Sequence, residues 1–457
     1  QEWVDDLAES SGIRLLNYNW FQGTREMFTK ALVLAGEPDS VDETIRLGFL
    51  SLWIAIEASE RLTMRQAQRD SQARIDGSLY ESIAEDSASA KRSMPVLHPG
   101  RGGVVLPTRP AIGASVSPTV MNDATKKALV ESCDFITMPM RWIEMEPIEG
   151  EYAYTPTDRW IEWAIRQAKL PVVAGPVVDF RPHCVPEWLY IWENDYDTLR
   201  DLVYEHMKAI VTRYRRTVSR WTVCSGLHCG DHFKLDFQQM IDLTRISVLV
   251  VRKLHPRARV QVEIVQPWGG YHTGDRRSLP PLLYAEMLTQ SGVPIDAFSL
   301  RVQMGSYKPG QDTRDLMAFS SMLDQYAMLD RPISISGLGC PSEPLSPSEH
   351  PEQYAEPGRW RSGWNEQGQA DWLSAYASVA LSKPYIESVC WHEFADPAKV
   401  TEMRSGGVLN KAFEPKPALA RMRDLHDSLA DGRVPQRLST MTMTGQAPAA
   451  ASGTKMS

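Results

Sequence analysis

The chain has 457 residues, of which 43% are hydrophobic and 23% are charged, as in ordinary globular proteins. Its 49 Lys and Arg residues are outnumbered by 57 Asp and Glu residues, which gives a formal net charge of −8 and a pI near 5.8. The hydrophobic content excludes a mostly disordered chain. The charge balance excludes a chain that binds nucleic acids or anionic membranes through an excess of positive charge.

Residues 1–80 have a helical pattern. The spacing of the apolar residues predicts a short helix over Thr24–Ala35 and a long helix over Asp42–Arg74, which contains no proline. We expect these two helices to form a hairpin. The long helix has an apolar stripe through which copies of the chain could associate into a homo-oligomer. The next residues, 81–110, are rich in Ser, Ala, Gly and Pro, which is typical of a linker.

Residues 111–432 have a different sequence pattern, in which short β-rich runs alternate with amphipathic helical patterns. The predicted strands are Ala111–Val116, Phe135–Met138, Val172–Val178, Arg220–Cys224, Val260–Val265, Ala297–Val302, Ile333–Ser336 and Ser388–Trp391. The predicted helices are Asp123–Ser132, Asp158–Gln167, Leu199–Arg215, Gln239–Leu254, Leu282–Gln290, Thr313–Leu329, Gln367–Leu381 and Pro417–Leu429. Eight strand–helix units in this order predict an α/β protein with a (β/α)8 TIM barrel.

A doubly wound parallel sheet is the alternative architecture. It is less favoured because no glycine-rich dinucleotide-binding turn follows any of the strands, and we expect no cofactor. Residues 433–457 are of low complexity and are predicted to form a tail. No apolar run approaches the ~18 residues of a transmembrane helix, so we expect no transmembrane segment.

In a barrel of this kind, functional side chains lie just after the strands, at the carboxyl-terminal face. The residues that follow the predicted strands include basic, acidic and aromatic types that suit polar recognition. These candidates are Arg141, Asp179, Arg181, His228, Gln266, Trp268, Arg301, Gln303, Trp391, His392 and Glu393. The indole rings among them could stack on sugar rings.

The stretch from Cys224 to His232 holds several side chains that zinc can bind, namely Cys224, His228, Cys229, Asp231 and His232. Two cysteines with four residues between them and one histidine nearby are not a standard zinc spacing, so we expect buried thiols and no metal site. Only six cysteines and no Asn-x-Ser/Thr sequon occur, which favours a cytoplasmic location. A secreted or periplasmic location stays open, because the chain starts at a glutamine and an upstream signal could have been removed.

Several segments resemble glycoside hydrolase family 10, the xylanase family. MRWIEMEPIEGEYAYTPTDRWIEWA (140–164) is similar to the second strand–helix unit of that family, and RYRRTVSRW (213–221) is similar to the approach to its fourth strand. GVPIDAFSL (292–300), VCWHEFAD (389–396) and PKPA (415–418) match later segments in the same order. The chain is most similar to a divergent, planctomycete-type branch of the family. The resemblance implies a TIM barrel that acts on or binds a saccharide.

The two catalytic positions of the family do not match. The family places its general acid/base Glu at the end of the fourth strand, where this chain has Gly226. It places its nucleophilic Glu on the seventh strand, where this chain has Gly337. Retaining glycoside hydrolysis needs both carboxyl groups, about 5–5.5 Å apart, and glycine supplies neither a proton nor a nucleophile. The resemblance therefore predicts a xylanase-like scaffold without the standard retaining mechanism.

Three functions remain open at this point. The first is a carbohydrate-associated barrel that binds glycans through the strand-end residues without standard xylanase activity. The second is an active glycoside hydrolase with a rebuilt carboxylate site, for which Glu393 and Asp179 are the candidate acid and base. Alternatively, these two carboxylates have a purely structural role and form ion pairs with arginines of a polar barrel mouth. The third function is that of a structural or oligomeric scaffold built on the N-terminal helices.

Overall fold

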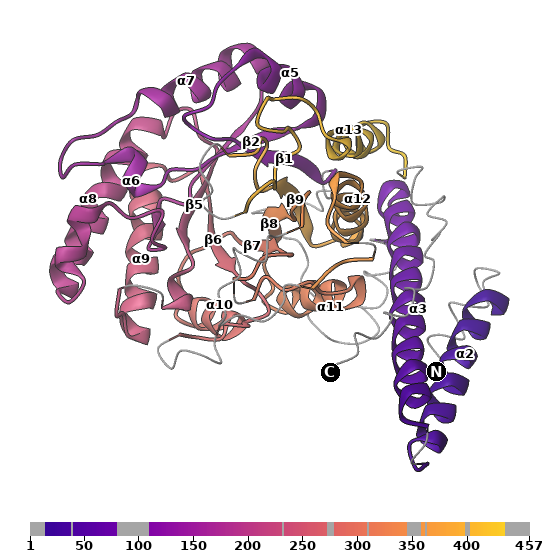
Figure 1. Cartoon of the computed structure of the whole chain (residues 1–457). Helices are drawn as coiled ribbons and strands as arrows, with labels where there is room; N and C mark the ends of the chain where they lie inside the picture. Colours follow the sequence, from indigo (N-terminus) through magenta and orange to yellow (C-terminus); the bar gives the residue numbers. More distant parts are fainter. Residues whose placement is uncertain are drawn as a thin grey trace, which may run out of the picture.

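Nine short parallel strands form one closed sheet in the computed structural model (Figure 1). The structure describes residues 14–37, 40–79, 109–230, 233–271, 278–308, 310–344, 358–361, 363–397 and 403–434. The strands are β1 (Ala111–Ser115), β2 (Phe135–Met138), β3 (Val172–Ala174), β4 (Val178–Asp179), β5 (Arg220–Ser225), β6 (Arg259–Val265), β7 (Ala297–Gln303), β8 (Ile333–Gly339) and β9 (Ile386–Trp391). The predicted linker and tail lie almost entirely outside the described residues, as do Asp231 and His232.

The sheet closes because β1 pairs with both β2 and β9, and β3 pairs with β5. Strands β3 and β4 both pair with β5 and therefore occupy one barrel position between them. The result is an eight-position parallel barrel, which confirms the predicted (β/α)8 fold and shows that the doubly wound alternative is wrong.

Helices surround the barrel and follow the strands along the chain (Figure 1). The main ones are α5 (Asp123–Ser132), α7 (Thr155–Trp163), α8 (Tyr196–Tyr214), α9 (Phe237–Leu254), α10 (Pro281–Gln290), α11 (Leu316–Ala327), α12 (Glu366–Ser382) and α13 (Pro417–Ala430). Shorter turns are α6 (Trp142–Met145), η2 (Ala164–Ala168), η3 (Glu187–Trp192) and η4 (Leu227–Cys229). Side-chain caps fix many of the helix starts: Asp236 forms a capping box with Gln239, and Asn122 accepts a hydrogen bond from the Thr125 amide.

The third strand is divided, although the sequence predicts one continuous strand over Val172–Val178. Gly175 has φ of +110°, and a Cβ atom at this position would lie 2.1 Å from the carbonyl oxygen of Thr222. The next residue, Pro176, has no amide hydrogen to donate to a ladder. The chain therefore leaves the sheet for three residues and rejoins it at Val178.

Two helices precede the barrel, α2 (Arg14–Leu34) and α3 (Val41–Asp76), and they form the predicted hairpin (Figure 1). The second half of α3 packs on α11 and α12. Arg74 donates hydrogen bonds to the carbonyls of Leu381, Lys383 and Ile386, which closes the end of α12. Within the described residues, no helix combines the length and apolarity that crossing a membrane requires.

Alternating side chains on the barrel strands separate an apolar shell from a polar interior. On β6, Val260, Val262 and Ile264 belong to the apolar core, whereas Gln261 and Glu263 line an internal cavity. This follows the two-residue period of a strand. TIM-barrel interiors are usually filled by bulky aliphatic residues, so the polar interior marks the barrel axis as the place to look for a site.

Candidate functional site

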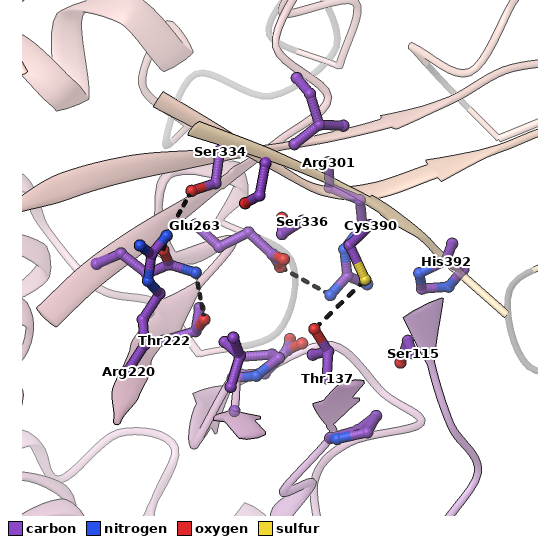
Figure 2. Close-up of a pocket in the computed structure, with 18 of the residues that line it drawn as sticks. Ser115, Thr137, Arg220, Thr222, Glu263, Arg301, Ser334, Ser336, Cys390 and His392 are labelled. Carbon is purple, nitrogen blue, oxygen red and sulfur yellow. Dashed lines mark hydrogen bonds and ion pairs between the residues drawn. The ribbon is translucent and has the colours of Figure 1, made fainter. Parts of the chain in front are cut away.

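A cavity of about 40 Å³ lies within the barrel (Figure 2). This volume has room for about three water molecules. Polar side chains from eight of the nine strands contribute to its lining, and β3 contributes only Val173. The lining residues are Ser115, Phe135, Thr137, Pro139, Arg141, Val173, Gly175, Pro176, Asp179, Arg181, Cys184, Arg220, Thr222, Gln261, Glu263, Arg301, Ser334, Ile335, Ser336, Ser388, Cys390 and His392.

The end of the cavity near the strand starts is a closed hydrogen-bond network. Arg220 donates to Ser334 Oγ at 2.9 Å and forms an ion pair with Glu387 at 3.0 Å. Beside it, Gln261 Nε2 donates to Thr222 Oγ1 at 2.8 Å. Burial lowers the pKa of Arg220, an effect that Glu387 opposes. These bonds satisfy the polar groups of the barrel floor and indicate a structural role there.

The middle of the cavity is occupied by an ion pair between Glu263 on β6 and Arg301 on β7. Figure 2 shows the two side chains pointing toward each other, and Arg301 Nη2 lies 2.7 Å from Glu263 Oε2. Their side chains are only 2% and 8% exposed. Ser225 at the end of β5 donates to the same carboxylate oxygen at 2.5 Å. Glu263 Oε2 is therefore already engaged by a guanidinium and by a hydroxyl donor.

A second carboxylate, Asp179 at the end of β4, is held by Arg181. Arg181 donates to it from Nε, Nη2 and its backbone amide. Burial alone would raise the pKa of Asp179, but Arg181 and, further away, Arg301 outweigh burial and leave the pKa below its ordinary value. The geometry agrees with a structural role for Asp179 in an ion pair with an arginine. The lowered pKa makes Asp179 a poor general acid at neutral pH.

Gly226 and Gly337, which stand where the resemblance expects catalytic glutamates, both lie at the carboxyl-terminal side of the barrel. Gly226 directly follows β5 and has φ of +66°, a region that residues with a side chain rarely adopt. A Cβ atom there would lie 3.2 Å from Val265 Cγ2. Gly337 lies in β8, and a Cβ atom there would lie 3.0 Å from His392 Nδ1 and 3.1 Å from Arg301 Cγ. The surroundings of both positions therefore fit glycine closely.

Five of the residues proposed from the sequence meet at this cavity: Arg141, Asp179, Arg181, Arg301 and His392. The rest do not line it: His228, Gln266, Trp268, Gln303, Trp391 and Glu393.

Two of the residues outside the cavity are interior side chains. Trp391 is 2% exposed, and its indole N–H donates to the Gly406 carbonyl at 2.9 Å, so its ring offers no face to a ligand at the barrel mouth. His228 is fully buried, stacks on Tyr284, and its Nε2 bonds to the Val265 carbonyl. Burial lowers the pKa of His228 to about 4.

The others take different positions around the barrel end. Gln303 accepts a hydrogen bond from Gln311 Nε2 at 3.1 Å, and both side chains are buried. Gln266 adopts a positive φ of 47° just after β6, and Trp268 packs half-buried against the core. Glu393 follows β9 and is half-buried.

Glu263 lines the cavity but is not among the site residues proposed from the sequence. The residue is a carboxylate within a strand, and its direction cannot be assigned without the register. The alternation in RVQVEIV (259–265) is the available signal, because its polar residues fall on one face and its aliphatic residues on the other. The inward face of that strand has to be the polar one once the outer face packs on helices.

The cysteines lie in the protein interior and are not linked in disulfides. Burial raises the pKa of Cys224 and of Cys390 to about 12, so both are neutral thiols at physiological pH. Among the residues that the structure describes, no group of three or more His, Cys, Asp or Glu side chains could hold a metal ion.

Comparisons with known proteins agree on the type of barrel. Residues 107–236 match the sequence model of glycosyl hydrolase family 10. The fold is similar to native xylanase 10B from Thermotoga maritima, with a TM-score of 0.53 and 17% identity over 71% of this chain and 97% of that one. It is also similar to a GH10 endoxylanase from a sugarcane soil metagenome (TM-score 0.53, 17% identity, 69% and 96% covered) and to the Thermobacillus composti GH10 xylanase (TM-score 0.52, 17% identity, 69% and 96% covered).

Proposed function

We propose that this chain, whose barrel is of the glycosyl hydrolase family 10 type, binds a saccharide at the barrel mouth and does not hydrolyse it by the retaining mechanism. The proposal rests on the pair Gly226 and Gly337, which lie at the carboxyl-terminal side of β5 and β8, where the sequence resemblance expects the two catalytic carboxyl groups. Both glycines sit in surroundings that fit the absence of a side chain.

The remaining carboxylates of the cavity do not replace the lost chemistry. A retaining hydrolase needs one protonated carboxyl group and one free carboxylate nucleophile. Glu263 is bound to Arg301 and Ser225, and Asp179 is bound to Arg181. Each carboxylate is thus engaged by a guanidinium group, and neither is free to attack a sugar carbon.

Saccharide binding would use the outer part of the cavity. Arg141 and Arg181 have side chains that are 19% and 15% exposed, and His392 lies beside Gly337. Guanidinium and imidazole N–H groups are suitable donors to sugar hydroxyl oxygens. Since the whole cavity holds only about three waters, a sugar ring would lie across its rim and direct a hydroxyl group inward.

Calorimetric titration with a panel of xylo-, cello- and manno-oligosaccharides tests the binding part of the proposal. We expect saturable binding of at least one member, weakened about tenfold or more by Arg141→Ala, because one charged donor at the rim is lost. Arg423→Ala is the matched control, since Arg423 forms a comparable ion pair with Glu131 between α13 and α5. Binding to no member, or equal weakening by both variants, would refute a saccharide site at this rim.

An active hydrolase that uses Asp179 and Glu393 is the competing proposal. Asp179 lines the cavity, which favours its involvement, but Glu393 is not among the lining residues. If hydrolysis of any panel member is detected, Asp179→Asn and Glu393→Gln should each abolish it under this alternative. Activity that survives both substitutions would remove these two residues from consideration.

A further inference from the structure

The hairpin of α2 and α3 carries large apolar side chains that face solvent. On α3 these are spaced by four, four, three and four residues, which is close to the pattern of a helix–helix seam. Each of the side chains is between 41% and 70% exposed. They are Phe21, Phe28 and Leu32 on α2, and Val41, Ile45, Phe49, Leu52 and Ile56 on α3. We call these eight residues the hairpin patch. Val33 of α2 is also exposed but lies on a different face of that helix.

All eight residues lie on one side of the hairpin. At 3.6 residues per turn, the α2 members fall within about 40° of arc, roughly 80° around the helix from the buried Ala31. On α3, Leu47 and Ser51 are buried between the helices. The α3 members of the hairpin patch fall within about 80° of arc, centred roughly 140° around the helix from these two residues. The direction of rotation, taken along the chain, is the same as on α2. Because the two helices run antiparallel, equal senses of rotation bring both stripes to the same side.

The hairpin patch continues a surface that is already buried in the monomer. Further along α3, Thr63 and Ala67 lie within about 40° of the same line of the helix and are buried, and Glu57, Glu60 and Met64 are buried further around the helix. This part of α3 packs on α11 and α12 of the barrel. Figure 1 shows α3 extending past the barrel together with α2. The stripe that is apolar and exposed at one end of α3 thus runs on into a mixed polar and apolar face that is buried against the barrel at the other end.

The size of the hairpin patch fits a protein partner. Large apolar side chains offer roughly 150–200 Å² each, so eight residues about half exposed give roughly 800 Å² on one copy. That is close to the ~800 Å² per partner of a stable interface and above the ~300–600 Å² of the largest patch on a typical monomer.

The charges around the hairpin patch argue against a membrane surface. The exposed charged residues near it are Arg25, Glu26, Lys30, Glu37, Asp42, Glu43 and Arg46, so acidic residues slightly outnumber basic ones. Helices that lie on anionic membranes have a polar face rich in Lys and Arg. A surface of mixed charge and helical spacing is instead suited to pair with an identical one around a two-fold axis.

We infer that the hairpin patch joins two copies of this chain, with the two hairpins packed against each other as a four-helix arrangement. Burial of the eight side chains supplies the driving force. The barrels stay outside the interface, so saccharide binding at the barrel mouth does not depend on it.

Sedimentation velocity of the full chain between 1 and ~100 µM tests this inference. We expect a species of twice the 51.5 kDa chain mass. Phe49→Glu, at the most exposed position of the hairpin patch, should shift the protein to monomer and raise the dissociation constant at least 100-fold. Ile191→Glu is the matched control, because Ile191 is 72% exposed outside the hairpin and should leave the dimer unchanged.

Circular dichroism melting of both variants checks that they fold as the wild type does, which is expected because both positions are exposed. A wild-type monomer over the whole concentration range would overturn the inference. So would a dimer that survives Phe49→Glu, a larger assembly, or a monomer that sediments with phosphatidylserine vesicles.

Discussion

Glu263 and Arg301 are a buried ion pair on neighbouring strands, and their removal from water is costly unless each satisfies the other. Loss of one member leaves the other as an uncompensated charge. We expect Glu263→Gln alone or Arg301→Met alone to lower the free energy of unfolding by about 3–5 kcal/mol. The double substitution should cost at least about 1 kcal/mol less than the sum of the two.

Urea unfolding of the wild type and the three variants measures this coupling. Additive effects of the two substitutions would contradict the pair, because residues that do not interact lose stability independently. A stability loss below about 1 kcal/mol for each single variant would contradict the burial of the two charges.

His228 should make the stability depend on pH. Its pKa is lowered from 6.5 to about 4 in the folded chain because burial disfavours the imidazolium form. The unfolded chain therefore binds a proton first as the pH falls. The stabilisation is complete above pH 6.5 and is lost between 6.5 and about 4, by up to about 3 kcal/mol.

Chemical denaturation from pH 7.5 to 4 of the wild type and His228→Gln checks this effect. Glutamine does not titrate, and its amide can still donate a hydrogen bond toward the Val265 carbonyl. The variant should lose less stability than the wild type as the pH falls. Parallel curves for the two proteins would show that His228 does not titrate differently in the folded state.

For single residues, the sequence predicted which residue types line the site better than it predicted which individual side chains reach the cavity. Arg141, Asp179, Arg181, Arg301 and His392 were identified because residues that follow parallel strands meet at one end of a barrel. Trp391, the last residue of β9, and His228, in the turn η4 after β5, also lie at strand ends, but both side chains are buried away from the cavity. Side-chain direction at a strand end depends on register, which a single sequence does not specify.

Element boundaries were predicted closely where local signals agree. The helix over Asp123–Ser132 and the strand over Phe135–Met138 match the structure at both ends, because Asn122 caps the helix and an apolar run forms the strand. The predicted long helix differs from α3 by one residue at its start and two at its end. The divided third strand was missed, since the close approach of Gly175 to Thr222 is a tertiary contact.

The segment 140–164, which carries much of the family resemblance, has a packing role in the structure. Glu146 accepts hydrogen bonds from the Trp142 indole and the Gly150 amide, both at 2.9 Å, and its Oε2 lies 2.9 Å from His206 Nδ1. Trp142 in turn stacks on His206 at 4.1 Å between ring centroids. These residues hold the loop after β2 against α8, so packing alone explains their types.

Gly175 offers a test of the third strand. Gly175→Ala should cost more than about 3 kcal/mol or prevent folding, because its Cβ atom would lie 2.1 Å from the Thr222 carbonyl oxygen. Gly150→Ala is the control, since Gly150 has φ of +78° and a Cβ atom there would meet no other atom within 4 Å. Its cost should be only the backbone strain, about 1–2 kcal/mol.

Thermal and urea unfolding of both glycine variants compare the two costs. Equal losses for Gly175→Ala and Gly150→Ala would mean that backbone strain accounts for everything. In that case the close approach of β3 to β5 would not be the reason for the break in the strand.

The whole molecule combines a xylanase-like barrel with a polar, closed axis and a helical hairpin on its flank. The fold was predictable because eight strand–helix units in succession leave few alternative topologies. The function was not, because the same barrel supports many activities and the deciding residues are few. The sequence signal on which the proposed function rests is the presence of Gly226 and Gly337 where the family resemblance expects carboxyl groups.

One titration tests the central claim that binding persists without retaining hydrolysis. Xylohexaose is titrated into the full-length protein in a calorimeter, and the contents of the cell are analysed by mass spectrometry after a day. The account predicts a saturable heat of binding and intact xylohexaose. Shorter xylo-oligosaccharides in the cell would contradict it, since they would require a pair of working carboxyl groups that Gly226 and Gly337 cannot supply.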